Sequence, residues 1–165
     1  MAVYHEKIEI ETEAKTTFHN VTSEAKNIVL NSGIKNGLLT VYSQHTTCSV
    51  IIQEDSLDIT DEGTKYLLQD LIDGLGKIFP KSTRVGQYLH PGPKCLKYCE
   101  EELHESQKET LNTDAHLRSC LIGRSESIPI INGEIELGDF GVIYFIDFDS
   151  VRPRKRFVNF QLVGE

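Results

Sequence analysis

The stretch Ser127-Ile128-Pro129-Ile130-Ile131-Asn132-Gly133-Glu134-Ile135-Glu136-Leu137 decides the fold class. Two short runs, 127–131 and 134–137, flank the dipeptide Asn132-Gly133. Asn-Gly is the strongest short signal for a two-residue β-hairpin, because both residues accept the positive φ that a type I′ turn needs. The stretch therefore predicts a pair of antiparallel strands near the C-terminal end of the chain.

Strand and helix patterns elsewhere complete an α+β chain. Alternating or β-branched runs predict five more strands, at 3–12, 37–44, 48–53, 142–148 and 157–163. We interpret 37–44 and 48–53 as the two strands of a hairpin. Three helices are expected, starting at Thr22 or Ser23, near residue 57, and at Asn112 or Thr113, with ends at Gly33, at Gly74 or Gly76, and at Gly123. Consecutive hairpins after mixed elements favour α+β over a doubly wound sheet.

Length, charge and the lengths of apolar runs restrict the class of protein to which the chain can belong. At 165 residues the chain is the length of one domain, and 17 Lys+Arg against 25 Asp+Glu give a net charge of −8. This charge argues against nucleic-acid or anionic-membrane partners, which need a clustered basic face. No apolar run approaches the roughly 20 residues of a membrane span, and the first residues have no signal-peptide character. We therefore expect a cytoplasmic protein whose four cysteines are free thiols.

The first histidine motif is Gln44-His45-Thr46-Thr47-Cys48-Ser49, between two predicted strands. A neutral imidazole at His45 could bind a divalent metal, with a neighbouring hydroxyl or carbonyl, as from Thr46 or Thr47, fixing its tautomer. The structural alternative is a strand-end histidine hydrogen-bonded to backbone.

The second histidine motif, Asn112-Thr113-Asp114-Ala115-His116-Leu117-Arg118-Ser119, opens the last predicted helix. Free N–H groups at a helix start favour an anion, and Arg118 and Ser119 could add to such a site. In the alternative interpretation Asp114 complements the helix dipole and His116 faces solvent.

Two charged groups are further candidates. Glu54 follows the predicted strand 48–53, where with Asp55 it could supply an acid, a base or a magnesium ligand, or simply cap the next helix. The run Arg152-Pro153-Arg154-Lys155-Arg156 lies between the last two strands. Arginines there could bind phosphate bidentately, or the run could be a solvated turn.

Residues 80–112 differ in composition from the rest, with three prolines and the charged run Glu100-Glu101-Glu102. A connection this long is unusual in a compact domain unless it is functional or partly disordered. Part of it, about 94–109, could form a solvated helix. Cys95-x3-Cys99 with His104 resembles part of a zinc site, although cysteines four apart on a helix are more often packing residues.

The two histidine motifs, taken together with other text in the same order, resemble the YjbQ (UPF0047) family. The matching text is Gly37-Leu38-Leu39, 45–49, 114–119, Leu121-Ile122-Gly123, 127–138, 142–145 and the end of the chain through Val163-Gly164-Glu165. These motifs cover nearly the whole chain. The third family histidine normally lies in a Tyr-x-His segment about ten residues before the second motif. Here Tyr88-Leu89-His90 matches the text and His104 matches the spacing, so an insertion is expected within 80–112.

The resemblance implies a single domain over 1–165, a sandwich of two mainly antiparallel sheets with two to three helices, assembled as a homotrimer. It also implies a histidine cluster near the subunit interface that holds a divalent metal ion, zinc or magnesium. The expected ligands are His45, His116 and either His90 or His104.

The activity implied by the resemblance is that of a secondary thiamine-phosphate synthase, which joins a pyrimidine diphosphate to a thiazole phosphate and releases pyrophosphate. Such chemistry needs positive charge on the leaving diphosphate. We expect Asp114, Arg118 and Glu54 to serve as catalytic groups. Phosphate or cofactor contacts are expected from Thr46, Thr47, Ser119, Arg152 and Arg154. The alternatives are a metal-dependent hydrolase of a small phosphorylated metabolite and a non-catalytic metal- or metabolite-binding trimer.

Overall fold

Five strands form the larger of two antiparallel sheets in the computed structural model, which describes residues 1–165. The strand order is β1-β8-β3-β5-β6. Their bounds are Ala2–Glu11 for β1, Lys155–Gly164 for β8, Gly37–Ser43 for β3, Ser125–Ile131 for β5 and Glu134–Ile135 for β6. The alternating N-terminal pattern pairs with β8 along its whole length, from Ala2 opposite Gly164 to Glu11 opposite Lys155. Two distant segments of the chain are thereby joined in one sheet.

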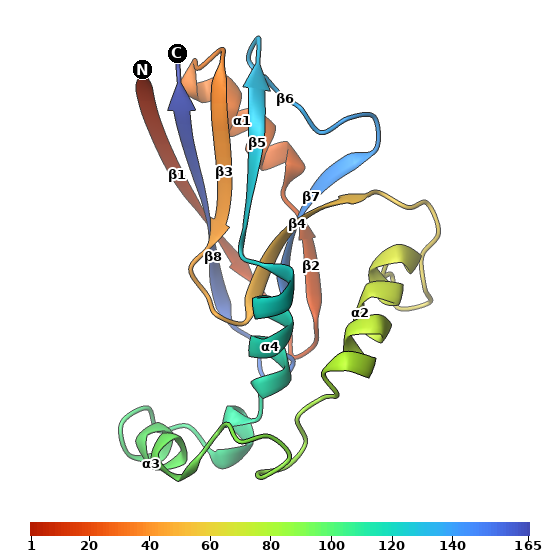
Figure 1. The fold of residues 1–165 in the computed structure, drawn as a ribbon, viewed down its shortest axis with the longest axis vertical. Coiled ribbons are helices and arrows are strands. Elements are labelled where there is room, and N and C mark those ends of the chain that lie inside the picture. Colours follow the sequence, from red (N-terminus) through yellow and green to blue (C-terminus); the bar gives the residue numbers. More distant parts are fainter.

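The second sheet has three strands in the order β2-β7-β4. Their bounds are Thr17–Asn20 for β2, Gly141–Asp147 for β7 and Cys48–Glu54 for β4. Strand β7 is central and almost wholly buried, because one face meets the five-stranded sheet and the other meets helices. The expected α+β sandwich of two antiparallel sheets is confirmed, and Figure 1 shows its two layers.

Four α-helices and a short 3-10 helix complete the fold, against the two to three helices expected. They are α1 (Thr22–Ser32), α2 (Tyr66–Ile78), α3 (Pro93–Glu101), η1 (Gln107–Thr110) and α4 (Thr113–Ile122). Helix α1 contributes to the core between the sheets, while α2 and α4 cover the outer face of the three-stranded sheet. Helix α3 lies away from both sheets, at the end of the molecule opposite the two termini (Figure 1). No helix combines the length and apolar character that crossing a bilayer requires.

The main core lies between the sheets and is built from alternate residues of facing strands. Leu39 and Val41 of β3, and Phe160 of β8, meet Val50 of β4 and Phe145 of β7, all fully buried. Burial of this kind contributes roughly 25 cal/mol per Å² of apolar surface, the dominant favourable term in folding. A smaller cluster of Leu68, Leu75, Ala115, Tyr144, Ile146 and Phe148 attaches the helices to β7.

The Asn132-Gly133 turn is confirmed. It joins β5 to β6, and both residues have positive φ, 54° and 85°. These are the conformations that a type I′ turn requires. The turn therefore fixes the register at this edge of the larger sheet.

The expected hairpin of 37–44 and 48–53 is wrong. Strand β3 pairs with β5 and β8, whereas β4 pairs with β7 in the other sheet. The chain crosses between the layers at 44–47, so Leu39 and Val41 of β3 share the core with Val50 of β4 in the other sheet. The short strand β2, which pairs with β7, was not predicted.

The predicted helix at 57–75 is displaced. Residues before Tyr66 form a loop closed by a bridge between Ile59 and Lys65, and the Asp58 carbonyl accepts a hydrogen bond from the Tyr66 amide. The helix then continues through Gly74 and Gly76 to Ile78. Two glycines cost roughly 1 kcal/mol each in a helix, which the burial of Leu68 and Leu75 offsets.

A methyl group at Gly37 should destabilise the sandwich, whereas one at Gly76 should not. A Cβ on Gly37 would lie 2.2 Å from the Val163 carbonyl oxygen of β8, while one on Gly76 meets nothing within 4 Å. We expect Gly37→Ala to lower the free energy of unfolding by about 1–3 kcal/mol. Gly76→Ala should raise it by about 0.5–1 kcal/mol. Urea denaturation measures both, and equal effects of the two variants would contradict the close approach of β3 and β8.

Candidate functional site

The two histidine motifs meet at one end of the sandwich. The Ser119 hydroxyl of α4 donates to the Cys48 carbonyl at 2.6 Å, and the Ser49 hydroxyl of β4 faces the Ser119 carbonyl at 3.5 Å. The backbone of Thr46 lies close enough to the imidazole of His116 to raise its pKa. Segments about 70 residues apart thus form one surface, which is the condition for a shared site.

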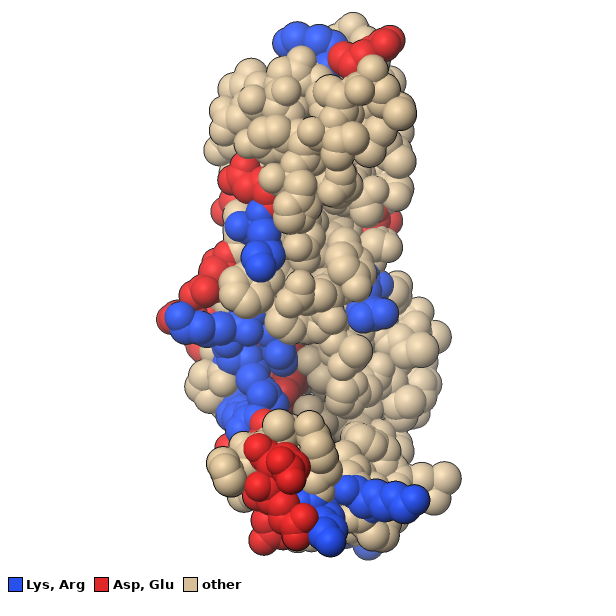
Figure 2. Space-filling model, turned by 90° about the vertical axis from the view of Figure 1, so that its left-hand side faces the viewer, with Lys and Arg blue, Asp and Glu red and all other residues tan.

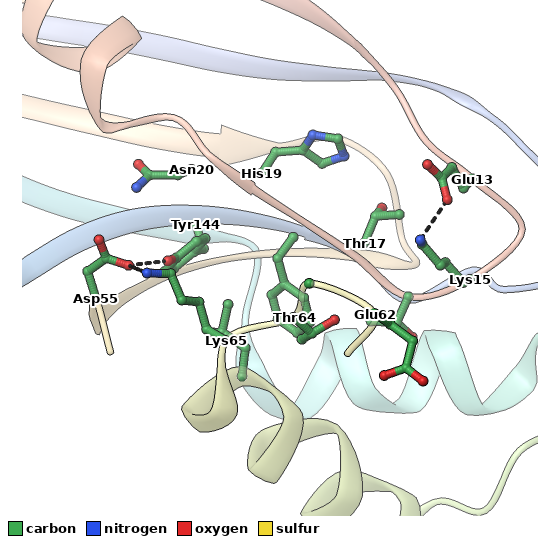
Figure 3. A pocket seen from close by; sticks show the side chains of 14 residues that line it. Glu13, Lys15, Thr17, His19, Asn20, Asp55, Glu62, Thr64, Lys65 and Tyr144 are labelled. Atoms are coloured by element: carbon green, nitrogen blue, oxygen red, sulfur yellow. Dashed lines mark hydrogen bonds and ion pairs between the residues drawn. The ribbon is translucent and has the colours of Figure 1, made fainter. Parts of the chain in front are cut away.

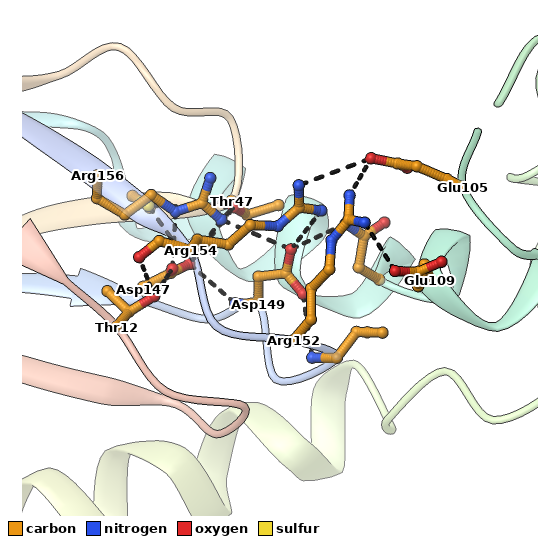
Figure 4. A network of polar contacts seen from close by, with 12 residues as sticks. Thr12, Thr47, Glu105, Glu109, Asp147, Asp149, Arg152, Arg154 and Arg156 are labelled. Carbon is orange, nitrogen blue, oxygen red and sulfur yellow. Dashed lines mark hydrogen bonds and ion pairs between the residues drawn. The ribbon is translucent and has the colours of Figure 1, made fainter. Parts of the chain in front are cut away.

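A buried ion pair lies beneath this surface. The Arg156 guanidinium of β8 donates from Nε to Oδ2 of Asp147 at 2.7 Å and from Nη2 to Oδ1 at 3.2 Å. Asp147, the last residue of β7, is fully buried and also accepts a hydrogen bond from the Thr12 hydroxyl at 3.0 Å. Arg156 Nη2 reaches the Thr47 hydroxyl at 3.0 Å. The pair therefore ties both sheets to the first histidine motif (Figure 4).

Two outer arginines continue this network toward solvent. Arg152 contacts Glu105 and donates to Glu109 at 2.8 Å. Arg154 lies 3.7 Å from Glu105 and 3.3 Å from Asp149. Hydrogen bonds from Ser106, joined by Arg152, hold the pKa of Glu109 at about 2. The arginines expected to bind phosphate therefore each meet a carboxylate from the 80–112 segment (Figure 4).

The imidazole of His45 is hydrogen-bonded to the backbone of β8. Its Nε2 accepts the Phe157 amide of β8 at 2.9 Å, and its ring stacks on the Phe157 ring with centroids 6.1 Å apart. Burial and the nearby Arg156 lower its pKa, so the imidazole is neutral at pH 7. This is the structural alternative for His45, and it leaves only Nδ1 for a ligand.

His116 has another histidine beside it. The rings of His90 and His116 meet edge to face with centroids 5.8 Å apart, and the Thr113 hydroxyl donates to the His90 carbonyl at 2.6 Å. Burial lowers the pKa of His116, and the charge of His90 lowers it further. His104 is exposed on the loop between α3 and η1. Of the two candidates for the third histidine, the fold thus places His90 at His116.

The residues of one chain do not by themselves fit a metal ion. No group of three or more His, Cys, Asp or Glu side chains is arranged to hold one. His90 and His116 supply two imidazoles, whereas a catalytic zinc site takes three protein ligands. The Cys95 and Cys99 sulfurs lie 3.9 Å apart on α3 without a third ligand.

The remaining predicted residues divide into buried anchors and one distant group. Asp114 accepts the Ser82 amide at 3.0 Å and pairs with Arg118 at 3.2 Å, and Arg118 donates to the Phe79 carbonyl at 2.9 Å. Both side chains are buried and tie α4 to the segment that follows α2. Glu54 is exposed at the opposite end of β4, six residues from Cys48 and so about 20 Å away along the strand.

Sequence reasoning missed the carboxylates that balance the arginines. Asp147 and Asp149 close β7 with the same two-residue spacing as Arg152, Arg154 and Arg156 in the next segment. This repeated spacing was the available signal, because alternate residues of an extended chain share a face. Nothing local marked Glu105 or Glu109, whose pairing depends on how the 80–112 segment folds back.

A cavity of about 430 Å³ lies elsewhere, between β2, β7 and the loop before α2. At one end the Tyr144 hydroxyl donates to Asp55 at 3.0 Å, and Lys65 lies 3.1 Å from the same oxygen (Figure 3). Burial and this hydrogen bond raise the pKa of Tyr144 to about 12, so the hydroxyl stays protonated. The Thr17 hydroxyl and His19 Nε2 are buried there without a partner. Of the candidates named from the sequence, Asp55 lines this cavity, whereas the histidine motifs and the arginine run do not.

Removing the guanidinium of Arg156 should cost far more stability than removing its neighbour's charge. Arg156→Met leaves the Asp147 carboxylate buried without a counter-ion, and we expect a loss of about 3–5 kcal/mol in the free energy of unfolding. Lys155 is exposed, so Lys155→Met should change it by less than about 1 kcal/mol. Chemical denaturation measures both, and similar losses would show that the buried pair is not special.

Replacing His90 should change the pKa of His116, whereas replacing His104 should not. Since the charge of His90 lowers the pKa of His116, His90→Gln should raise that pKa. His104→Gln is the matched control and should leave it unchanged. NMR of the imidazole C–H protons against pH measures the midpoint. A shift caused by the His104 variant, or none by the His90 variant, would contradict this ring pair.

Comparison with known proteins gives a consistent result. The family model described as UPF0047 protein YjbQ-like matches residues 6–165. A UPF0047 protein of Synechocystis is 31% identical over 162 residues, covering 98% of this chain and 92% of that protein. One from Methanothermobacter thermautotrophicus is 28% identical, covering 100% of this chain and 95% of that protein.

Two solved structures extend the likeness to the fold. An uncharacterised conserved protein of the YjbQ/UPF0047 family from Clostridium acetobutylicum superposes with a TM-score of 0.70 at 28% identity, covering 96% of this chain and 99% of that one. A protein of unknown function from Sulfolobus solfataricus gives a TM-score of 0.74 at 21% identity, covering 99% of each chain. The motifs, the sandwich and these relatives agree, and the chain belongs to the UPF0047 protein YjbQ-like family.

Proposed function

We propose that this protein is an enzyme acting on a small phosphorylated metabolite at the end of the sandwich where the histidine motifs meet. The observation that carries the proposal is the neutral, partly buried His116 imidazole, which lies against the His90 ring and close enough to Arg156 for that charge to lower its pKa. Asp149 and Arg156 both influence the pKa of His116, and Asn112 of the same helix lies 3.4 Å from Asp149. A neutral imidazole can accept a proton at pH 7, and arginines bind phosphate oxygens.

The reaction we propose is that of a secondary thiamine-phosphate synthase. In it, a pyrimidine diphosphate and a thiazole phosphate are joined as pyrophosphate leaves. Negative charge gathers on the leaving diphosphate as its bond to carbon breaks, and donors placed there in advance lower the barrier. Arg152 and Arg154 are the groups of this chain suited to that role, because their side chains are partly exposed. Figure 2 shows one face of the molecule, on which Lys and Arg side chains gather mainly in the lower half, next to a group of Asp and Glu side chains.

A divalent metal ion, zinc or magnesium, belongs to the same proposal. When bound it would supply positive charge for a phosphate group. Because one chain offers only His90 and His116 together, the proposed homotrimer would have to provide the further ligand. The four free thiols fit a reducing, cytoplasmic location, and the net charge of −8 fits a small-molecule partner in preference to nucleic acid.

A coupled assay tests the reaction. The full chain, supplied with the two thiamine precursors and magnesium or zinc, should release pyrophosphate, and His116→Ala should lower kcat/KM by about 10²-fold or more, as loss of an acid–base group does. His104→Ala is the matched control and should keep wild-type activity. Absence of pyrophosphate release under all metals would sink the synthase proposal.

Metal content separates the remaining classes of function. We expect His90→Ala and His116→Ala to lower the metal bound per chain, measured by elemental analysis after dialysis, while His104→Ala does not. Phosphate release from a metabolite panel, in place of pyrophosphate release, would support the hydrolase. Metal binding without any turnover would support a binding protein.

A further inference from the structure

The two outer arginines converge on one oxygen atom. Nη2 of Arg152 and Nη1 of Arg154 both approach Oε1 of Glu105, the latter at 3.7 Å. Two guanidinium groups aimed at a single anionic oxygen make the arrangement that binds a carboxylate or a phosphate. In this conformation the anion is a side chain of the protein itself.

This arginine pair has donors to spare. Arg154 Nε is buried without a partner, and its other contacts, to Glu105 and Asp149, are ion pairs of 3.7 and 3.3 Å. A guanidinium has five N–H donors, and a carboxylate has only two oxygens to offer. A phosphate group presents at least three oxygens and more negative charge. Glu105 therefore occupies the position of a bound anion but leaves some of the guanidinium N–H donors without an acceptor.

Glu105 comes from a segment that the core does not hold. Its amide donates to the Cys99 carbonyl at 2.9 Å, and the next residue, Ser106, forms a capping box with Glu109. Helix α3 packs chiefly against η1, and Figure 1 shows it apart from both sheets. Glu105 can thus be withdrawn without disturbing either hydrophobic cluster.

The inner and outer arginines differ in exposure. The side chains of Arg156 and Asp147 are 10% and 0% exposed, whereas those of Arg152 and Glu105 are 25% and 19% exposed. The inner pair cannot be opened without burying a lone charge. The outer pairs are reached by solvent and are individually weak, so a soluble anion can compete for them.

We infer that Arg152 and Arg154 form a phosphate-binding site, and that Glu105 is an internal competitor which a phosphate dianion must displace. This inference deepens the proposed function and rests on its assignment of phosphate binding to the arginines. The 93–110 segment then acts as a lid whose release accompanies phosphate binding.

Titration of the full chain with inorganic phosphate at low salt tests the competition. Glu105→Gln removes the competing charge and should tighten phosphate binding about two- to fivefold, the factor that corresponds to one partly exposed ion pair. The matched control is Glu101→Gln, an exposed carboxylate of α3 that lies 3.9 Å from Lys97. It should bind phosphate as the wild type does. Arg154→Met should lose binding in both the wild-type and the Glu105→Gln backgrounds.

Hydrogen exchange gives a second readout that needs no variant. Adding phosphate to the wild-type protein should speed amide exchange across 93–110 and leave β7 and β8 unchanged. In Glu105→Gln the segment should exchange fast already, with little further change. A Glu105 that serves only as a structural contact would loosen the segment when replaced and leave phosphate affinity unaltered.

The competition by Glu105 and phosphate binding by the arginines can fail separately. If Arg154→Met abolishes binding but Glu105→Gln binds phosphate no tighter than the wild type, the competition is overturned and the arginine site stands. If neither the wild type nor Glu105→Gln binds inorganic phosphate or pyrophosphate, the arginine site falls, and the proposed phosphate chemistry falls with it.

Discussion

The charge of Asp147, buried at the end of β7, has to be balanced inside the sandwich, and much of the surrounding structure follows from that constraint. A lone carboxylate there would cost several kcal/mol. Arg156 from β8 balances it through two hydrogen bonds, and Thr12 adds a third after β1. Because β7 and β8 lie in different sheets, one ion pair sets how the two layers meet at this end.

The same pair explains why the candidate site lies where it does. Arg156 also reaches Thr47, which fixes the first histidine motif, and Asp149 is oriented by its own amide bonding to Asp147 at 3.0 Å. Asp149 in turn lies near Arg154 and the start of α4. The partly exposed Arg154, which can change partners, is therefore positioned by the buried Asp147–Arg156 pair, which cannot.

Local patterns predicted the elements well and their partners less well. The Asn132-Gly133 turn and the strand at 3–12 could be read directly, since each depends on neighbouring residues only. The pairing of β3 and β4 with different sheets could not, because an apolar run does not say which layer will bury it. The acidic residues Asp58, Asp61 and Glu62 favoured a helix that starts near residue 57, yet α2 begins at Tyr66.

The candidate site likewise divides into features that neighbouring residues predict and features that depend on tertiary contacts. The motifs around His45 and His116 predicted that two distant segments would meet, and they do. The pairing of Arg152 with Glu105 depends on the path of the 80–112 segment, which no spacing in the sequence specifies. The hydrogen bond from the Phe157 amide to His45 is likewise a tertiary contact, and it moves His45 toward a structural role.

The partners of Asp147 have a consequence for how the molecule assembles. Its contacts with Thr12 and Thr47 span 135 and 100 residues of chain. Loops of that length are costly to close before their contacts form. A nascent or partly folded chain can therefore hold the Asn132-Gly133 hairpin and single helices while the site is still absent. The site then arises together with the docking of the two sheets, so a ligand that binds it selects fully folded molecules and stabilises them by mass action.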